Sequence, residues 1–317
     1  MKSPYGTGNG CRCCATRPRY SERVPFLPVR PLRPGSRVGV VAPAGPFDRP
    51  SFEKGLALIA SRYTPVVAPD IGASHRYLAG DDTRRLAELQ AALALDAVFC
   101  ARGGYGSQRL LPSLRPEVMP QRPLVGFSDI TALHALWQVA GWRSLHGPVL
   151  TQLGSQPAAV VDRLFSMLES SAPPAALTGT GGVGQGTAEG PLLGGNLSVF
   201  TRLIGTPFMP PLDGAILLVE DVGERPYRLD RMFMHLQLSG AFDRIAGFAL
   251  GDFTGCDEKN ADYGPLDVLV ELIAATKKPA VLGLAIGHGA VNVPVPLGAR
   301  VRIDPGAATL TFLEGLV

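Results

Sequence analysis

Three side chains that could together attack a carbonyl carbon follow apolar runs of the sequence. Ser128 follows PLVGF, Glu220 follows AILLV, and His288 follows VLGLAIG. A serine, a base that takes its proton and an acid that orients the base are the groups needed for nucleophilic catalysis through an acyl intermediate. Ligands of parallel α/β sheets bind beyond the carboxyl ends of the strands. The sequence therefore predicts Ser128 as nucleophile, Glu220 as acid and His288 as base.

The residues around Ser128 leave a second interpretation open. The chain order Ser, Glu, His is that of the α/β-hydrolases, but their G-x-S-x-G turn would have glycine where this chain has Ile130. Serine and aspartate also begin helices by accepting free backbone N–H groups, and an amphipathic run follows Asp129. On the residues alone, Ser128 is either a nucleophile or a helix cap.

The base and the acid each have rivals. His288 is preferred because Gly287 and Gly289 flank it, which lets the backbone bend and a substrate approach. His146 precedes Gly-Pro and could line a site. The other histidines have less suitable positions. His75 lies in a connection without special context, and His134 lies on a different face of the helix that follows Ser128. His235 lies among Met and Leu, which indicates a packing residue.

Glu224 competes with Glu220 for the role of acid. Glu220 ends its strand directly, whereas Glu224 lies nearer the following helix, where a carboxylate stabilises the N-terminus. Arg228 and Arg231 could pair with either carboxylate. We therefore prefer Glu220.

The glycine-rich stretch ARGGYG raises the question of a nucleotide. The pattern G-x-G-x-x-G would need a third glycine where the chain has Arg109, and no G-K-[S/T] sequence exists. The stretch is either a tight strand–helix turn or a loop whose backbone N–H groups face a developing oxyanion. We predict no cofactor.

Composition and charge indicate a two-domain globular protein. The 317 residues are 46% hydrophobic and 18% charged, with a net charge of +3. This charge argues against a nucleic-acid groove, and no apolar run is long enough to cross a membrane. Residues 1–33 are basic and Pro-rich without the apolar middle of a signal peptide, so we expect a disordered extension, or an upstream start codon that is not used, and a cytoplasmic protein.

The five cysteines do not indicate a disulfide framework. Cys11, Cys13 and Cys14 lack partners at zinc spacing, which argues against a metal site. Cys100 and Cys256 lie in apolar runs and are expected to be buried.

Short apolar runs alternate with helical ones from Arg37 onward, which predicts an α/β fold with a parallel sheet covered on both faces. Residues 153–187 are rich in Gly, Thr and Pro and are predicted to be a linker that begins with one helix. A second α/β unit follows, and its last residues alternate like a β-hairpin.

Several long motifs carry a resemblance. They are VAPAGPFD, ARGGYGSQRLL, LVGFSDITALHALW, GPLLGGNLSVFTRLIGTPFMP, AILLVEDVGERPYRLDRM and GLAIGHG. Over about residues 36–310 the chain resembles the LD-carboxypeptidase family of serine peptidases, the muramoyl-tetrapeptide carboxypeptidases. The resemblance implies a Rossmann-like domain with the nucleophile at 34–152 and a mixed α/β domain with acid and base at 188–317.

The family's site residues map onto this chain one by one. The serine of GFSD is Ser128, the acid of LVED is Glu220, and the histidine of GHG is His288. The resemblance implies an oxyanion hole made by the backbone amides of Asp129 and of Gly103 or Gly104. It implies no metal, and it implies removal of the terminal D-Ala from murein tetrapeptides during cell-wall recycling in the bacterial cytoplasm.

The substrate and the partners are less well determined. A cationic side chain should meet the free carboxylate of the substrate, for which Arg102 and Arg231 are candidates, and Asn196 could bind the peptide. A related subfamily cleaves a peptidyl-nucleotide antibiotic with the same triad; the absence of a long insertion between Glu220 and His288 favours the murein peptide. A non-catalytic α/β ligand-binding module is the alternative of another class. Whether the chain forms a homodimer stays open.

Overall fold

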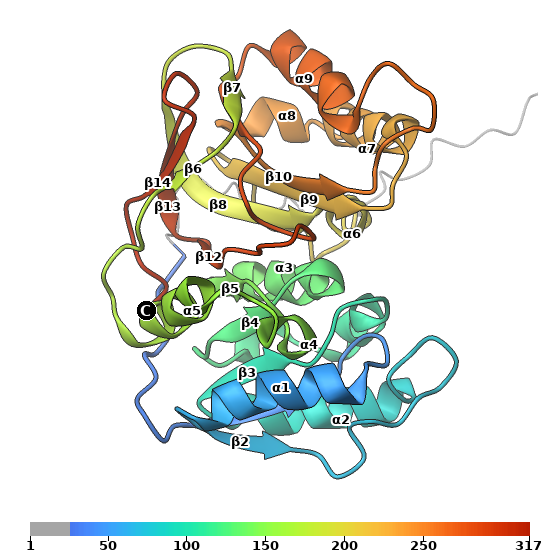
Figure 1. Ribbon diagram of the computed structural model, residues 1–317, viewed down its shortest axis with the longest axis vertical. Coiled ribbons are helices and arrows are strands. Elements are labelled where there is room, and N and C mark those ends of the chain that lie inside the picture. The colour runs from blue at the N-terminus through green and yellow to red at the C-terminus, as the bar shows by residue number, and fades with distance from the viewer. Residues whose placement is uncertain (1–25) are drawn as a thin grey trace, which may run out of the picture.

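The computed structural model describes residues 26–317, and its first domain is built on a six-stranded sheet (Figure 1). The strand order is β12-β5-β4-β3-β1-β2, and β12 alone is antiparallel to its neighbour. These short strands are largely apolar, as expected of a sheet covered on both faces. Their bounds are β1 Arg37–Val41, β2 Thr64–Val67, β3 Ala97–Cys100, β4 Leu124–Gly126, β5 Ser144–His146 and β12 Val295–Leu297.

Helices connect the parallel strands of this domain. Asp48 and Asp81 begin α1 and α2, because each carboxylate accepts the amide hydrogen three residues ahead. The helices are α1 Arg49–Ala60, α2 Asp82–Leu93, α3 Thr131–Val139, α4 Leu150–Leu153 and α5 Ala158–Glu169, with 3-10 turns η1 Ser107–Ser113, η2 Pro116–Val118 and η3 Ser128–Ile130.

The second domain is built on an eight-stranded mixed sheet that curls around its own core (Figure 1). Its order is β6-β14-β13-β8-β9-β10-β11-β7, and the four strands from β8 to β11 are parallel. The predicted terminal hairpin is confirmed as β13 and β14. The strands are β6 Leu177–Thr178, β7 Gly181–Val183, β8 Ala188–Asn196, β9 Ile216–Val222, β10 Gly247–Thr254, β11 Ala280–Leu282, β13 Arg300–Asp304 and β14 Thr309–Phe312; the helices are α6 Leu197–Thr201, α7 Pro226–Leu238, α8 Ala241–Arg244 and α9 Pro265–Thr276.

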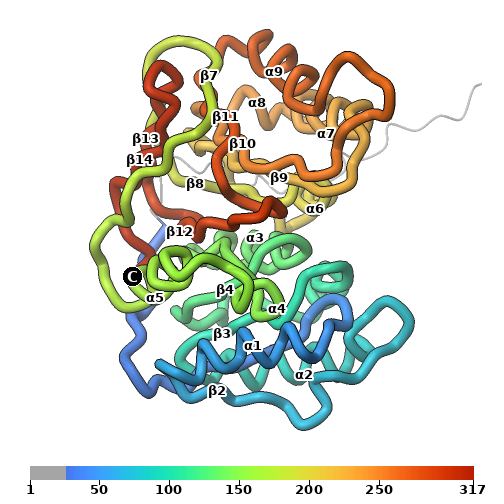
Figure 2. Tube along the Cα trace, in the orientation of Figure 1, coloured from blue at the N-terminus to red at the C-terminus, as the bar shows by residue number. Residues whose placement is uncertain are grey.

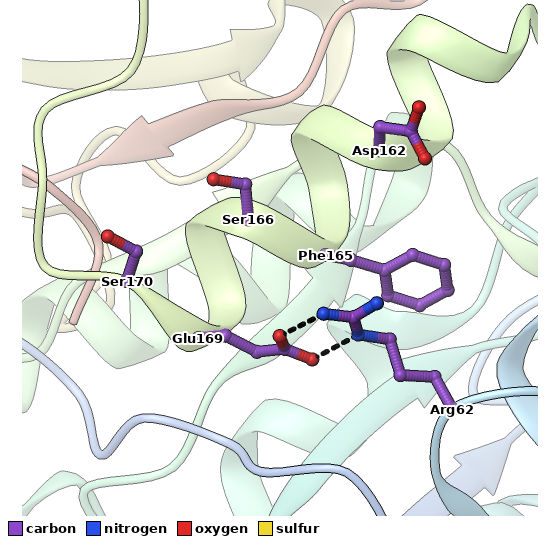
Figure 3. A pocket seen from close by; sticks show the side chains of 6 residues that line it. All are labelled: Arg62, Asp162, Phe165, Ser166, Glu169 and Ser170. Carbon is purple, nitrogen blue, oxygen red and sulfur yellow. Dashed lines mark hydrogen bonds and ion pairs between the residues drawn. The ribbon is translucent and has the colours of Figure 1, made fainter.

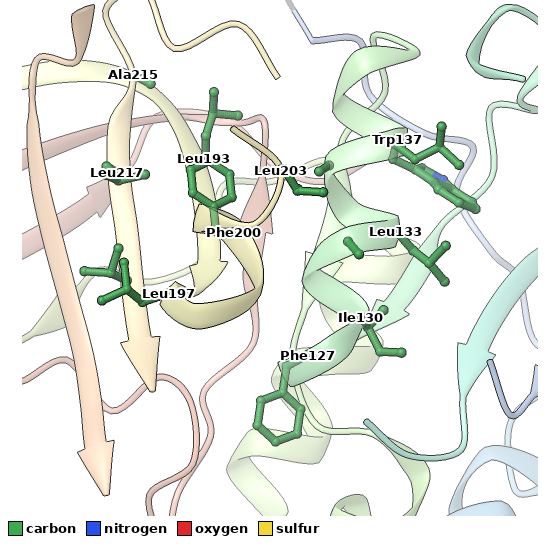
Figure 4. Close-up of a cluster of buried hydrophobic side chains, with 14 of the residues drawn as sticks. Phe127, Ile130, Leu133, Trp137, Leu193, Leu197, Phe200, Leu203, Ala215 and Leu217 are labelled. Carbon is green, nitrogen blue, oxygen red and sulfur yellow. The ribbon is translucent and has the colours of Figure 1, made fainter. Parts of the chain in front are cut away.

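Helix α3 lies between the two domains, and this explains its composition. Eight of its nine residues are buried, as expected of a helix covered on all sides. In Figure 4, Phe200 of α6 and Leu193 of β8 lie on one side of α3, whereas Leu133 and Trp137 extend from its other side, and all of these side chains belong to one buried cluster. Burial of each such side chain contributes about 1.5–3 kcal/mol to the stability of the fold. The turn η3, which contains Ser128 and leads directly into α3, is thereby fixed against the second domain.

The segments that flank the domains contain more structure than expected. Residues 1–25, with Cys11, Cys13 and Cys14, lie outside the described residues. Residues 26–33 do not form a disordered extension, because Val29 and Leu32 are buried in the first domain. In the segment 153–187, α5 packs on the first domain, whereas β6 and β7 pair with the second sheet.

Two further contacts tie these segments to the first domain. Arg62 forms a bidentate ion pair with Glu169 of α5 (Figure 3). The chain also returns at its end, since β12 joins the first sheet and Leu316 is buried in that domain's core (Figure 2). The predicted burial of Cys100 and Cys256 is confirmed. Within residues 26–317, no helix is long and apolar enough to cross a membrane.

Candidate active site

Ser128, His288 and Glu220 form one hydrogen-bonded chain. The Oγ of Ser128 lies 3.1 Å from Nε2 of His288, and Nδ1 of His288 lies 2.6 Å from Oε2 of Glu220. If Nδ1 donates to the carboxylate, Nε2 is left to accept from the serine hydroxyl. The three residues come from the turn after β4, the loop after β11 and the end of β9, so the structure brings together side chains 68 to 160 positions apart.

The backbone at Ser128 does not have the extended conformation of a helix N-cap. Its φ is +64°, in the left-handed region, which costs a non-glycine residue roughly 1–3 kcal/mol. No side chain caps η3 or α3 through a hydrogen bond. The capping interpretation of Ser128 is therefore wrong. A strained turn between strand and helix is also how the nucleophile elbow of α/β-hydrolases presents its serine.

The glycine-rich loop lies directly against this turn. A Cβ atom at Gly103 would be 2.8 Å from Cβ and 2.9 Å from Oγ of Ser128, and 3.4 Å from the backbone nitrogen of Asp129. Only glycine permits so close an approach. The carbonyl of Gly103 accepts the amide hydrogen of Gly45, and Gly104 follows with a φ of +104°. The backbone of the loop and the amide of Asp129 thus border the same side of Ser128.

The Asp129 side chain holds these two segments together. It is buried, and its carboxylate accepts the amide hydrogen of Ser107 at 2.8 Å. The Ser107 hydroxyl in turn donates to the Asp129 carbonyl. Burial raises the pKa of Asp129, while the hydrogen bonds from Ser107 act in the opposite direction. The aspartate of GFSD therefore fixes the start of η1 against the turn of Ser128.

His288 is held in a negative environment. Burial lowers its pKa, but the hydrogen bond and charge of Glu220, with the charges of Asp221 and Asp252, raise it above its ordinary value overall. The ring of Phe127 packs on the imidazole, with 4.7 Å between ring centroids. This environment favours a histidine that can accept and hold a proton.

Glu220, not Glu224, is the carboxylate that meets His288. Glu220 is fully buried at the end of β9. Glu224 instead pairs with Arg228 at 3.3 Å at the start of α7. Glycine at position 287 makes the Glu220 contact possible, because a Cβ atom there would lie 2.5 Å from Oε2 of Glu220.

The expected substrate-binding residues have other contacts in the structure. Arg102 is exposed and donates to the carbonyl of Pro46. Arg231 is exposed, with its guanidinium 5.8 Å from the ring centroid of Tyr227. Asn196 is buried, begins α6 by accepting the amide hydrogen of Val199, and donates to Asp221.

Of the other histidines, only His235 departs from expectation. His134 is buried, donates from Nε2 to the carbonyl of Gly126 and accepts at Nδ1 from the hydroxyl of Ser144. His146 is buried next to Phe127, with 5.9 Å between ring centroids. His235 is exposed, so its interpretation as a packing residue is wrong.

Sequence reasoning missed two carboxylates of this region, Asp221 and Asp252. Asp221 is buried and accepts from the side chain of Asn196 and the amide of Ser198. Burial, with the charge of Glu220, raises its pKa to about 6, against the effect of its hydrogen bonds. The signal in the sequence that could have identified Asp221 is its position directly after Glu220 in VED. Asp252 lies near the end of β10 and had no such signal.

A serine on a strained turn of a parallel sheet, facing a histidine and a buried carboxylate from a second domain, is the arrangement of a two-domain serine peptidase. Residues 38–147 match the LD-carboxypeptidase N-terminal domain, and residues 189–303 match the LD-carboxypeptidase C-terminal domain. The chain belongs to the LD-carboxypeptidase family of serine peptidases.

Two relatives illustrate this membership, and a third protein shares the fold. The murein tetrapeptide carboxypeptidase of Pseudomonas aeruginosa is 35% identical over 289 residues, which cover 84% of this chain and 93% of that protein. The structure of a muramoyltetrapeptide carboxypeptidase from Oxalobacter formigenes has a TM-score of 0.78 at 26% identity and covers 88% of this chain and 99% of that one. The microcin C7 self-immunity protein of Escherichia coli has the same fold, with a TM-score of 0.83 at 23% identity over 92% of this chain and 99% of that one.

Proposed function

We propose that the protein is a serine LD-carboxypeptidase that removes the terminal D-Ala from murein tetrapeptide, in the cytoplasm, during cell-wall recycling. The observation that carries this proposal is the hydrogen-bonded chain from Ser128 Oγ through His288 to Glu220, built on a strained serine turn. The names of the relatives from Pseudomonas aeruginosa and Oxalobacter formigenes support the choice of substrate.

In the proposed reaction, Ser128 Oγ attacks the carbonyl carbon of the residue before the terminal D-Ala, and His288 takes the serine proton. The amides of Asp129 and of Gly103 or Gly104 stabilise the oxyanion. His288 then gives its proton to the D-Ala amine as the C–N bond breaks, which leaves an acyl-enzyme. Water, deprotonated by His288, releases the shortened peptide. Glu220 fixes the imidazole tautomer and stabilises its cation.

Of the two arginines expected to bind the terminal carboxylate, we prefer Arg102. It directly precedes Gly103, whose backbone borders Ser128, whereas Arg231 lies on α7 beside Tyr227. Arg102 is exposed, so its guanidinium can turn from the Pro46 carbonyl to a substrate anion. Asn196 uses its amide within the protein, and we propose that it supports the site through Asp221 rather than binding the peptide.

The stereochemistry of the substrate provides the test. The scissile bond joins an L-configured acyl donor to a D-amino acid with a free carboxylate, and specificity is a difference in transition-state binding. Purified protein is incubated with L-Ala-γ-D-Glu-meso-diaminopimelyl-D-Ala, with the pentapeptide ending in D-Ala-D-Ala, and with the tetrapeptide amidated at its C-terminus. Mass spectrometry should show D-Ala release from the first peptide alone, and no release by Ser128→Ala.

The other outcomes are equally distinct. Cleavage of the pentapeptide at a comparable rate would contradict LD specificity, because its acyl donor has the opposite configuration. Inertness toward all three peptides with cleavage of a peptidyl-adenylate would replace the murein substrate with a peptidyl-nucleotide. Binding of any of these ligands without turnover would point to a non-catalytic module.

A further inference from the structure

Both glycines that flank His288 are packed against carboxylates. A Cβ atom at Gly287 would lie 2.5 Å from Oε2 of Glu220, and a Cβ atom at Gly289 would lie 2.4 Å from Oδ2 and 2.7 Å from Cγ of Asp252. No side chain fits at either position without moving a carboxylate. The sequence Gly-His-Gly is thus explained by two acidic neighbours of the loop, one on each side of the histidine, of which the proposed mechanism uses only Glu220.

Asp252 is positioned by the sheet next to the strand of Glu220. It lies near the carboxyl end of β10, which pairs in parallel with β9, and its amide donates to the carbonyl of Ile286 at 2.9 Å. Its own carboxylate reaches the other end of the same loop. Burial, with the charge of Glu220, raises the pKa of Asp252 overall, while the backbone amide of Gly289, which faces the carboxylate, and the charge of His288 act in the opposite direction. Asp252 therefore contacts the His288 loop on both sides of the histidine.

The Asp252 carboxylate is not used elsewhere in the described part of the chain. Its Oδ2 atom is buried and has no hydrogen-bond partner among residues 26–317. Such a group is costly unless a charge or dipole compensates it. In a site where His288 becomes positively charged during the reaction, a half-buried carboxylate gains that compensation as the cation forms.

We propose that Asp252 is a positioning residue of the active site, which holds the His288 loop through Gly289 and supports the imidazolium as a second carboxylate beside Glu220. This role rests on the proposed function, since it concerns the proton that His288 takes from Ser128. Asp252 acts through His288 and need not touch the substrate.

Titratable and polar groups face His288 from several elements of the structure. They are Glu220 and Asp221 from β9, Asp252 from β10, the buried His146 from β5, and the hydroxyl of Ser128. Burial has the largest effect on the pKa of His288 and lowers it. Among the carboxylates, Glu220 has the direct hydrogen bond and raises this pKa most, and the charge of Asp252 adds to the effect of Glu220. Removing the Asp252 charge should therefore lower the pKa of His288 without breaking its bond to Glu220.

The test compares Asp252→Asn with Asp257→Asn, which removes the same charge from an exposed position. The pKa of His288 is read from the histidine ring signals in an NMR titration, with the His288 signal assigned by its loss in His288→Gln. We expect the pKa to fall by roughly half a pH unit in Asp252→Asn, the scale of a partly exposed ion pair. No shift is expected in Asp257→Asn.

Kinetics give a second readout that a purely structural defect would not produce. In Asp252→Asn the acidic limb of the kcat/KM profile should move to lower pH, because the lower pKa keeps His288 neutral at more acidic pH. The value of kcat at the pH optimum should fall about 3- to 10-fold, a smaller loss than that expected for removing the Glu220 carboxylate. A folded variant with an unchanged His288 pKa would overturn the proposal. Asp252→Ser replaces the asparagine variant if that one does not fold, and the same shift is required of it. The titration needs no substrate, so its outcome is independent of whether the murein peptide is the right one.

Discussion

Replacing Gly287 by alanine should impair catalysis through Glu220 rather than through the histidine itself. The φ of Gly287 is +119°, which strains any other residue by roughly 1–3 kcal/mol. The added Cβ atom would also lie 2.5 Å from Oε2 and 2.9 Å from Cδ of Glu220. Relief of this overlap requires a shift of about 1 Å, since non-bonded heavy atoms in ordinary contact are about 3.5 Å apart. The 2.6 Å bond from Glu220 to His288 cannot survive that shift unchanged.

We expect kcat for D-Ala release to fall by about 10²-fold or more in Gly287→Ala, the loss that a misplacement of about 1 Å can cause in an active site. Gly205→Ala is the matched control, because Gly205 also has a positive φ, +82°, but open space around its Cβ direction. Both variants should melt at lower temperature, and only the first should lose turnover. The effects of Gly287→Ala and Glu220→Gln should not add, since both act on the same bond. Turnover in Gly287→Ala within about 3-fold of the control would refute the reasoning.

Three further predictions concern the acid, the buried histidines and the N-terminal segment. Glu220→Gln should lower kcat by about 10³- to 10⁴-fold, whereas Glu224→Gln should be mild; steady-state kinetics with the reverse result would reassign the acid. Burial lowers the pKa of His134 to about 4 and that of His146 well below its ordinary value, so below about pH 6.5 these two histidines bind more protons in the unfolded chain than in the folded one. Their contribution to the free energy of unfolding should therefore fall as the pH drops, by about 1.4 kcal/mol per pH unit for each histidine, whereas the raised pKa values of His288 and Asp221 act in the opposite direction. Urea unfolding at pH 7 and pH 5 of the parent and of His134→Gln isolates this contribution: the change in stability on acidification should be less unfavourable in the variant, and an equal change would contradict the prediction. A chain that starts at residue 34 should melt several degrees below one that starts at residue 26, because it lacks the buried Val29 and Leu32; equal melting temperatures would show that these side chains do not contribute.

The position of the site could be predicted from the sequence because it depends on strand ends. Apolar runs end just before Ser128 and at Glu220, and the carboxyl ends of parallel strands meet on one side of a sheet. The run before His288 is a strand only over Ala280–Leu282, and the rest is irregular backbone. The sequence instead indicates His288 through the glycines on either side of it. Both positions require glycine because each is packed against a carboxylate.

Other features depend on contacts between residues far apart in the chain, which no local pattern specifies. Strand β12 joins the first sheet although 148 residues separate its first residue from the end of β5, and Val29 is buried although its neighbours are basic and Pro-rich. The left-handed backbone at Ser128 lies directly against the Gly103 loop, a contact between segments 25 positions apart in the chain. Asp252 comes close to His288 only because β10 pairs with β9.

The most direct test of the proposed function is the rate of D-Ala release from the murein tetrapeptide by Ser128→Ala. The variant should keep the melting temperature of the parent or exceed it, and its kcat should fall by about 10³-fold or more, the scale seen when a member of such a triad is removed. Near-normal turnover by the folded variant would contradict the assignment of Ser128 as the nucleophile, and with it the serine peptidase mechanism.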